Sequence, residues 1–130
     1  MTRTTVMQRE SIVERCIENC QDCHGICVET IAYCLRLGAK HAGPKHITLM
    51  QDCADICKMS EDGMLRNSNF MRRICRLCAD ICISCAESCE MFPNDEAMIA
   101  CAQKCRECAD ICRQMSMVSE ETGTRLTSFS

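Results

Sequence analysis

Sulfur-bearing and apolar residues follow a helical period along this chain. The motif Cys-Ala-Asp-Ile-Cys occurs at 53–57, 78–82 and 108–112, and a variant, Cys-His-Gly-Ile-Cys, occurs at 23–27. Seven before, three before and four after the first cysteine of each copy, the residue is again Cys, Met or His. These offsets fall on one stripe of an α-helix, and the aspartate position points away from it. Each copy therefore predicts an amphipathic helix with a sulfur-lined buried face.

Breaks between the copies predict where the helices end. The segment 38–44 contains Gly43-Pro44, which suits a helix start, 67–69 is an Asn-Ser-Asn turn, and Asn94 after Pro93 is a candidate N-cap. We predict helices near 6–37, 44–62, 68–91 and 95–118, followed by a polar tail at 119–130. Short connections make neighbours antiparallel, so the expected fold is all-α: one domain, 1–130, forming an up-down-up-down four-helix bundle with a cysteine-lined core.

Composition narrows the possible functions. The chain has 16 Cys and 10 Met among 130 residues, but no Trp, one Tyr and three Phe. The net charge of −3 shows no basic excess, which argues against a nucleic-acid partner. No run of about 18 apolar residues occurs, so no membrane span is expected, and the first residues lack the apolar stretch of a signal peptide. We therefore expect a cytoplasmic protein whose reduced thiols bind metal.

Three other roles for the cysteines fit the pattern less well. Free cysteine packs as a small hydrophobe, but Ala, Leu and Val fill bundles without the risk of oxidation. Disulfides within a helix are disfavoured, because Cβ atoms four residues apart are separated by about 5–6 Å and a disulfide needs about 3.5–4.5 Å; bridges between helices remain open. Iron–sulfur clusters favour two consecutive two-residue gaps, and the run from Cys75 to Cys89 never has them.

Charge separates copper from zinc. Four Zn²⁺ ions, each held by four thiolates, would leave about −8 in a core with no Lys or Arg on its stripes. Cu(I) held by two bridging thiolates matches one charge to one thiolate, so we predict on the order of sixteen Cu(I) ions per chain. Zinc binding, or zinc stabilisation of the bundle, is the alternative function, and an iron–sulfur electron carrier is a weaker one.

The candidate metal ligands are the stripe residues of the four predicted helices. Cys53, Cys78 and Cys108 are expected to lie at one level of the sulfur-lined tube. His41 and Met115 are candidates for the route by which metal enters. No phosphate-binding glycine loop or His-Glu-x-x-His motif occurs, so we expect neither an enzyme nor an organic cofactor. The full set of candidate ligands is Cys16, Cys20, Cys23, Cys27, Cys34, Cys53, Cys57, Cys75, Cys78, Cys82, Cys85, Cys89, Cys101, Cys105, Cys108, Cys112, His46, Met50 and Met71.

The spacing Cys-x3-Cys-x2-Cys-x3-Cys and the repeated Cys-Ala-Asp-Ile-Cys resemble the bacterial copper storage proteins of the cytosolic type, over about residues 12–115. The resemblance implies a four-helix bundle, tetrameric assembly, and many Cu(I) ions held by thiolates along the core. His46, Met50 and Met71 stand where other copies of the repeat have cysteine. From the resemblance we expect the chain to assemble into a homotetramer. Copper chaperones are its other expected partners.

Overall fold

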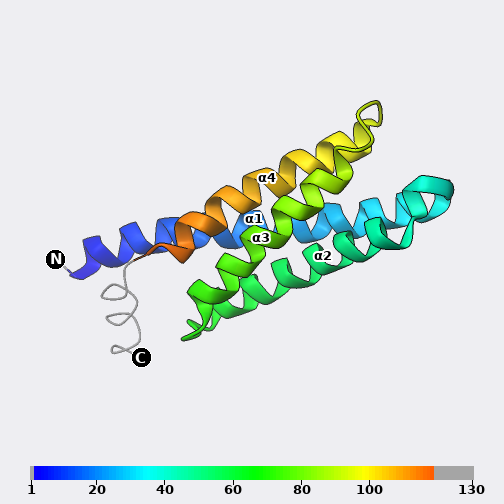
Figure 1. The fold of residues 1–130 in the computed structure, drawn as a ribbon. Coiled ribbons are helices and arrows are strands. Elements are labelled where there is room, and N and C mark those ends of the chain that lie inside the picture. The colour runs from blue at the N-terminus through cyan, green and yellow to red at the C-terminus, as the bar shows by residue number, and fades with distance from the viewer. Residues whose placement is uncertain (1, 119–130) are drawn as a thin grey trace.

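The computed structural model describes residues 2–118, and over 2–10 it describes the backbone without the side chains. Within this range the chain forms α1 (Thr2–Leu37), the 3₁₀ turn η1 (Ala39–Ala42), α2 (Pro44–Leu65), α3 (Met71–Cys89) and α4 (Glu96–Ser116). Each α-helix packs against two others, in the order α1, α2, α3, α4 and back to α1. Consecutive helices run antiparallel (Figure 1), which confirms the all-α up-down-up-down bundle over the described residues. The polar tail predicted at 119–130 lies outside them.

The first break lies where the glycines predict it. α1 ends at Leu37, and Gly38 adopts a φ of 72°, a conformation that glycine reaches without steric cost. The Gly38 N–H donates to the carbonyl of Cys34 at 3.0 Å, which closes the last turn of α1. η1 spans the connection, and α2 begins at Pro44 as predicted.

The second break comes later than predicted. α2 continues through Gly63 to Leu65, and Gly63 is buried where an added Cβ would make an ordinary contact with the Ile74 Cδ1 of α3, at 3.4 Å. The helix then ends in a Schellman motif, in which Asn67 takes a φ of 55° and the Ser68 N–H donates to the Gly63 carbonyl at 2.8 Å. This turn delays α3 to Met71, so the predicted start at 68 was wrong by three residues.

The third break corrects the predicted cap. Asp95, and not Asn94, is the N-cap of α4, since its carboxylate accepts hydrogen bonds from the N–H groups of Ala97 at 3.0 Å and Met98 at 3.2 Å. A charged cap also interacts favourably with the positive end of the helix dipole. α3 ends at Cys89 and α4 at Ser116, so both helices stop two residues before their predicted ends.

Cysteine and alanine fill the core in place of large aliphatic side chains. All sixteen cysteines are fully buried, and Ala54, Ala79 and Ala109, each next to the first cysteine of a repeat, are buried beside them. Ile56 and Ile111 flank the stripe at the seams, only 7% and 6% exposed. Small side chains let the helices approach closely, which brings sulfur atoms from facing helices into contact. None of the helices in residues 2–118 has the length and apolar character needed to cross a bilayer.

The two ends of the bundle differ in chemistry. The connections between α1 and α2 and between α3 and α4 lie at one end, which we call the histidine end because it holds His41 and His46. The connection between α2 and α3 and the end of α4 lie at the opposite end (Figure 1). We call this second end the methionine end, after the buried Met64, Met71 and Met115.

Candidate metal centre

Sulfur atoms from all four helices form one continuous column in the bundle. In the middle, the Cys57 Sγ lies 3.8 Å from that of Cys78 and 3.9 Å from that of Cys108, and Cys20 lies 3.9 Å from Cys108. One step toward the histidine end, the contacts are Cys23 to Cys53 at 3.9 Å, Cys23 to Cys105 at 3.8 Å and Cys53 to Cys82 at 3.7 Å. Cys57 to Cys82 at 3.9 Å connects the two layers.

These contacts correct the predicted level of the repeat. Cys53, Cys78 and Cys108 do not share a layer, because Cys53 pairs with Cys82 and Cys105 while Cys78 and Cys108 surround Cys57. Two features explain this. The antiparallel direction of α2 and α3 puts Cys53 level with Cys82 and Cys57 level with Cys78. The parallel helices α2 and α4 are shifted along the bundle axis, so Cys105 rather than Cys108 lies level with Cys53.

At the methionine end the column finishes on three cysteines. Cys16, Cys75 and Cys112 have all their Sγ atoms within 4.8 Å of one another, and Cys16 to Cys112 is 3.7 Å. On α2, Ser60 lies one turn beyond Cys57 on the same stripe. Its hydroxyl is buried and has no hydrogen-bond partner within the described residues. A buried hydroxyl without a partner costs about 1–3 kcal/mol, and sequence reasoning did not identify this residue.

At the histidine end the column changes from thiols to mixed ligands. The Cys34 Sγ lies 3.7 Å from His46 Nε2 and 3.5 Å from the Met98 Sδ. His46 Nδ1 lies 2.6 Å from the Ser88 hydroxyl, a contact that fixes the ring with Nε2 toward Cys34. Met98 is fully buried, and the prediction omitted it. Its signal was in the sequence, since Met98 continues the α4 stripe three residues before Cys101.

His41 is anchored outside the column. Its Nε2 lies 2.9 Å from the carboxylate of Asp95, which also accepts a hydrogen bond from the Tyr33 hydroxyl at 2.7 Å. The ring of Phe92 lies between the two histidines, with its centroid 4.2 Å from that of His41 and 5.1 Å from that of His46. The histidine end is thus covered by an aromatic lid over Cys34 and His46.

Burial of the thiols opposes their ionisation, while hydrogen bonds between neighbouring thiols raise the pKa of some cysteines and lower that of others, among them Cys75, whose pKa falls to about 5. Burial, and then the negative charge of Asp95, raises the pKa of Cys34 to about 11. Hydrogen bonds with Cys101 raise the pKa of both Cys85 and Cys89, which places these two thiols beside Cys101. Burial lowers the pKa of His46, so its imidazole is neutral near pH 7 and its Nε2 can donate a lone pair to metal. Metal binding to the column must therefore displace protons.

The column suits thiolate-bound metal. With metal–sulfur bonds of about 2.3 Å, two sulfurs on one tetrahedral ion lie about 3.8 Å apart, close to the contacts of 3.6–4.0 Å in the column. Spacing alone therefore fits zinc as well as copper. Charge distinguishes them, because the buried polar residues in the described part of the chain are Thr30, His46, Ser60 and Glu61, and none is a Lys or Arg. A monovalent ion in a one-to-one ratio neutralises this column fully, whereas zinc at one ion per four thiolates leaves about −2 at each site.

The structure places most of the predicted ligands in the sulfur column or at its ends, and one of them, His41, outside it. Met50 is fully buried on the α2 stripe, one turn before Cys53. Met71 and Met115 are 8% and 1% exposed at the methionine end, while His41 pairs with Asp95 away from the thiols. The remaining candidates are buried in or at the ends of the sulfur column: Cys16, Cys20, Cys23, Cys27, Cys34, Cys53, Cys57, Cys75, Cys78, Cys82, Cys85, Cys89, Cys101, Cys105, Cys108, Cys112 and His46.

A four-helix bundle with a continuous core of free thiols defines a class of bundle proteins suited to soft metals. The chain belongs to the copper storage protein family, whose sequence profile matches residues 9–117. It is 40% identical over 107 residues to the uncharacterized cysteine-rich protein YhjQ of Bacillus subtilis (strain 168), covering 82% of this chain and 98% of that protein.

Solved structures show the same relationship. The Cu(I)-bound copper storage protein BsCsp3 is similar with a TM-score of 0.76 and 39% identity, over 81% of this chain and 98% of that one. A cytosolic copper storage protein from Streptomyces lividans, loaded with five coppers, is similar with a TM-score of 0.73 and 27% identity, over 84% of this chain and 95% of that one. These relatives confirm the four-helix-bundle fold and the family resemblance found in the sequence.

Proposed function

We propose that this protein stores and buffers many Cu(I) ions on the thiolates of its core, and that it is not an enzyme. The observation that carries this proposal is the column of sixteen buried free thiols without a buried Lys or Arg among the described residues. Cu(I) at one ion per thiolate neutralises such a column, and sulfur is the ligand that soft Cu(I) prefers. The copper-loaded relatives support copper and give no support to zinc.

The proposed ligands are thiolates along the column, with neutral thioether and imidazole ligands added toward its ends. All sixteen cysteines bind copper, His46 through Nε2 and Met98 through Sδ complete the site around Cys34, and Met50 and Met71 supply thioethers. His41 and Met115 lie beyond the thiols, as expected for residues along a route of uptake. A thioether or neutral imidazole adds no negative charge, so these ligands extend the column without disturbing its charge balance.

Competition between metals tests the choice of copper. We expect the protein to retain its copper in the presence of equimolar Zn²⁺, and to lose bound zinc when Cu(I) is added, because thiolates bind the softer Cu(I) more tightly. Elemental analysis of protein purified from cells supplied with both metals reads the result directly. A preparation that carries about four zinc ions and no copper would establish the zinc-stabilised bundle instead.

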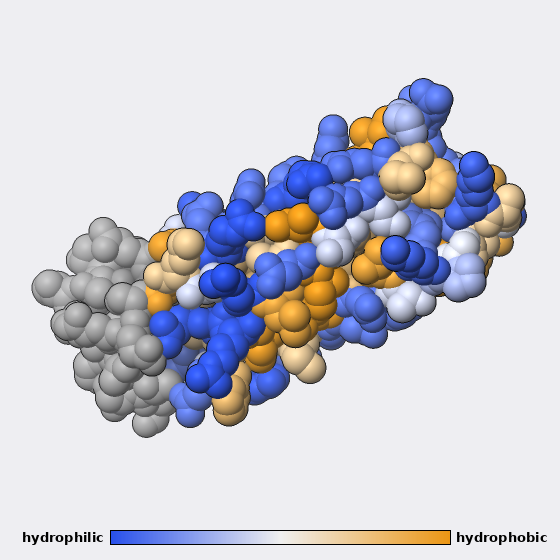
Figure 2. All heavy atoms as spheres, viewed as in Figure 1, coloured by the Kyte–Doolittle hydropathy of each residue, from blue (hydrophilic) through white to orange (hydrophobic). Residues whose placement is uncertain are grey.

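Assembly into a homotetramer is part of the proposal, together with a cytoplasmic location and exchange with copper chaperones. Several large apolar side chains are exposed, among them Val28 at 46%, Leu35 at 56% and Leu77 at 51%. Figure 2 shows hydrophobic surface gathered near the middle of the visible face of the bundle. Exposed apolar area of this kind marks a contact surface, since its burial between copies releases water.

Sedimentation measures the predicted assembly. We expect analytical ultracentrifugation of the metal-free protein at micromolar concentration to give a mass about four times the 14.7 kDa of one chain. Substituting Leu35 and Leu77 by Glu should shift the distribution toward smaller species with unchanged helicity, whereas Glu18→Gln on a polar face should not. A wild-type protein that sediments as a monomer throughout would contradict the tetramer.

A further inference from the structure

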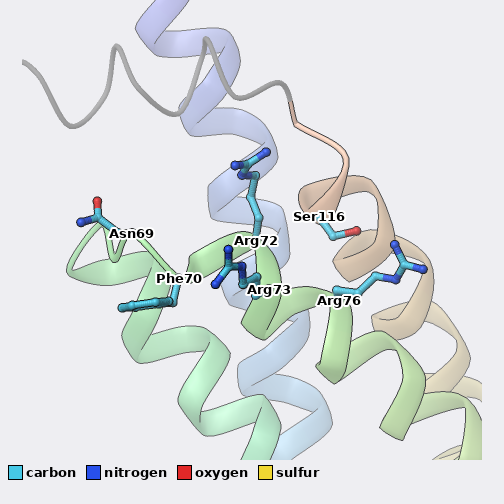
Figure 3. Close-up of a pocket in the computed structure, with 6 residues that line it drawn as sticks. All are labelled: Asn69, Phe70, Arg72, Arg73, Arg76 and Ser116. Carbon is cyan, nitrogen blue, oxygen red and sulfur yellow. The ribbon is translucent and has the colours of Figure 1, made fainter.

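A cavity of about 470 Å³ opens at the methionine end, beside the start of α3. The described residues that line it are Asn69, Phe70, Arg72, Arg73, Arg76 and Ser116. Figure 3 shows the three arginines projecting from the first turns of α3 in different directions, with Arg73 beside Phe70 and Arg76 on the far side of Ser116 of α4. The volume lies in the range of about 300–1,000 Å³ that is typical of small-molecule sites. We call this feature the arginine pocket.

The arginine pocket is strongly positive on a chain whose net charge is −3. Arg106, by contrast, forms two hydrogen bonds with the carboxylate of Glu90, at 2.8 and 2.9 Å. Within the described residues no carboxylate pairs with Arg73 or Arg76, and no acidic residue lies among the lining residues or in the first turn of α3. The positive end of the α3 dipole adds to the same potential. The pocket therefore favours an anionic ligand.

The arginine pocket adjoins the methionine end of the sulfur column. Its lining residues are sequence neighbours of the methionines that close this end: Phe70 and Arg72 flank Met71, and Ser116 follows Met115. One turn deeper, Cys75 follows Met71 on α3, and it belongs with Cys16 and Cys112 to the three-cysteine group that ends the column. The arginine pocket and the three-cysteine group therefore lie at the same end of the bundle.

We propose that the arginine pocket docks the anionic donor of copper, a Cu(I) complex of a small thiol that carries carboxylates. The inference rests on the proposed copper storage. The Arg73 and Arg76 guanidinium groups bind the carboxylates, Met71 and Met115 receive the ion, and Cys16, Cys75 and Cys112 take it next. Copper stays Cu(I) throughout: its bonds to the donor thiolates break, bonds to cysteine sulfur form, and the proton from each cysteine passes to a departing thiolate.

Uptake kinetics with two matched donors test this docking. The Cu(I) complex of glutathione is the anionic donor, and the Cu(I) complex of glutathione diethyl ester has the same thiol with its carboxylates masked. In Arg73→Glu/Arg76→Glu we expect uptake from the glutathione complex to slow about tenfold or more at low ionic strength, because electrostatic steering is reversed. Uptake from the ester complex and the final copper capacity should match the wild type in stopped-flow absorbance of the copper–thiolate bands.

A variant at the other end controls for overall charge. Arg36→Glu/Lys40→Glu makes the same change in net charge at the exposed surface of the histidine end. Equal slowing in both variants, or equal slowing with both donors, would overturn the proposal. Unchanged uptake in Arg73→Glu/Arg76→Glu would also overturn it. A wild type that loads no copper would instead contradict copper storage itself.

Discussion

Replacing the central layer Cys20, Cys57, Cys78 and Cys108 with alanine should lower the copper capacity from about sixteen to about twelve ions per chain. Contacts of Cys57 with Cys78 and Cys108, and of Cys20 with Cys108, link these four thiols in the middle of the column, so their loss removes both ligands and bridges. Helicity should persist, because alanine is the best helix former and the removed sulfur atoms are small. Anaerobic Cu(I) titration and circular dichroism measure the two effects.

Two matched variants distinguish ligand loss from general damage. Replacing the outward Asp55, Asp80 and Asp110 with asparagine should leave the capacity unchanged, since these side chains are exposed. Ser60→Cys should raise the capacity by about one ion, because it adds a thiol on the α2 stripe near the three-cysteine end of the column. An alanine variant that still binds about sixteen ions would show that the central thiols pack without binding metal.

Copper should raise thermal stability far more than it changes structure. We expect the metal-free protein to be folded and helical, because neutral thiols pack as small hydrophobes between the isoleucines and alanines of the seams. A site that binds the native state alone adds about 4 kcal/mol when free ligand exceeds its Kd by a thousandfold. For a bundle of this size one such site raises Tm by roughly 10 °C, and many sites raise it much further.

Circular dichroism during heating measures this prediction with and without copper. The two spectra at low temperature should be closely similar. The melting temperature of the copper-loaded protein should exceed that of the metal-free protein by at least roughly 10 °C. The Ser60→Ala variant serves as a control, since removal of the unpartnered hydroxyl should leave the metal-free protein as stable or more stable. A random-coil spectrum for the metal-free wild type would show that folding depends on metal.

Most of the fold could be predicted because one repeated pattern sets it. The offsets of 3, 4 and 7 residues fix the buried face of each helix, and the connections are too short for any but antiparallel neighbours. Boundaries were less predictable where a residue has two uses. A glycine often marks the end of a helix, but Gly63 lies inside α2, which runs on to Leu65. Both Asn94 and Asp95 are good caps, and only Asp95 reaches the free N–H groups.

The sequence predicts which side chains form the site better than it predicts which of them lie next to one another. All sixteen cysteines and Met50 lie in the core, as their stripe positions indicate. Which thiols share a level depends on the axial alignment of antiparallel helices, and the repeat does not encode this alignment. Met98 was missed because it lies ten residues before Cys108, an offset at which no other copy has cysteine. Ser60 was missed because serine is not a ligand that soft metals prefer, although the third copy has Cys85 at the same offset. His41 could not be placed, because its contact with Asp95 joins residues from two separate connections.

The titration of metal-free protein with Cu(I), under anaerobic and reducing conditions, tests copper storage most directly. Ions should bind tightly and stoichiometrically until their number approaches the cysteine count, on the order of sixteen per chain, because each thiolate bridges two ions and each ion takes two thiolates. The absorbance of the copper–thiolate bands and competition with a Cu(I) chelator both report the end point. Saturation at one to about four ions per chain would mean that the cysteines form discrete sites or simply pack, and would contradict storage along the column.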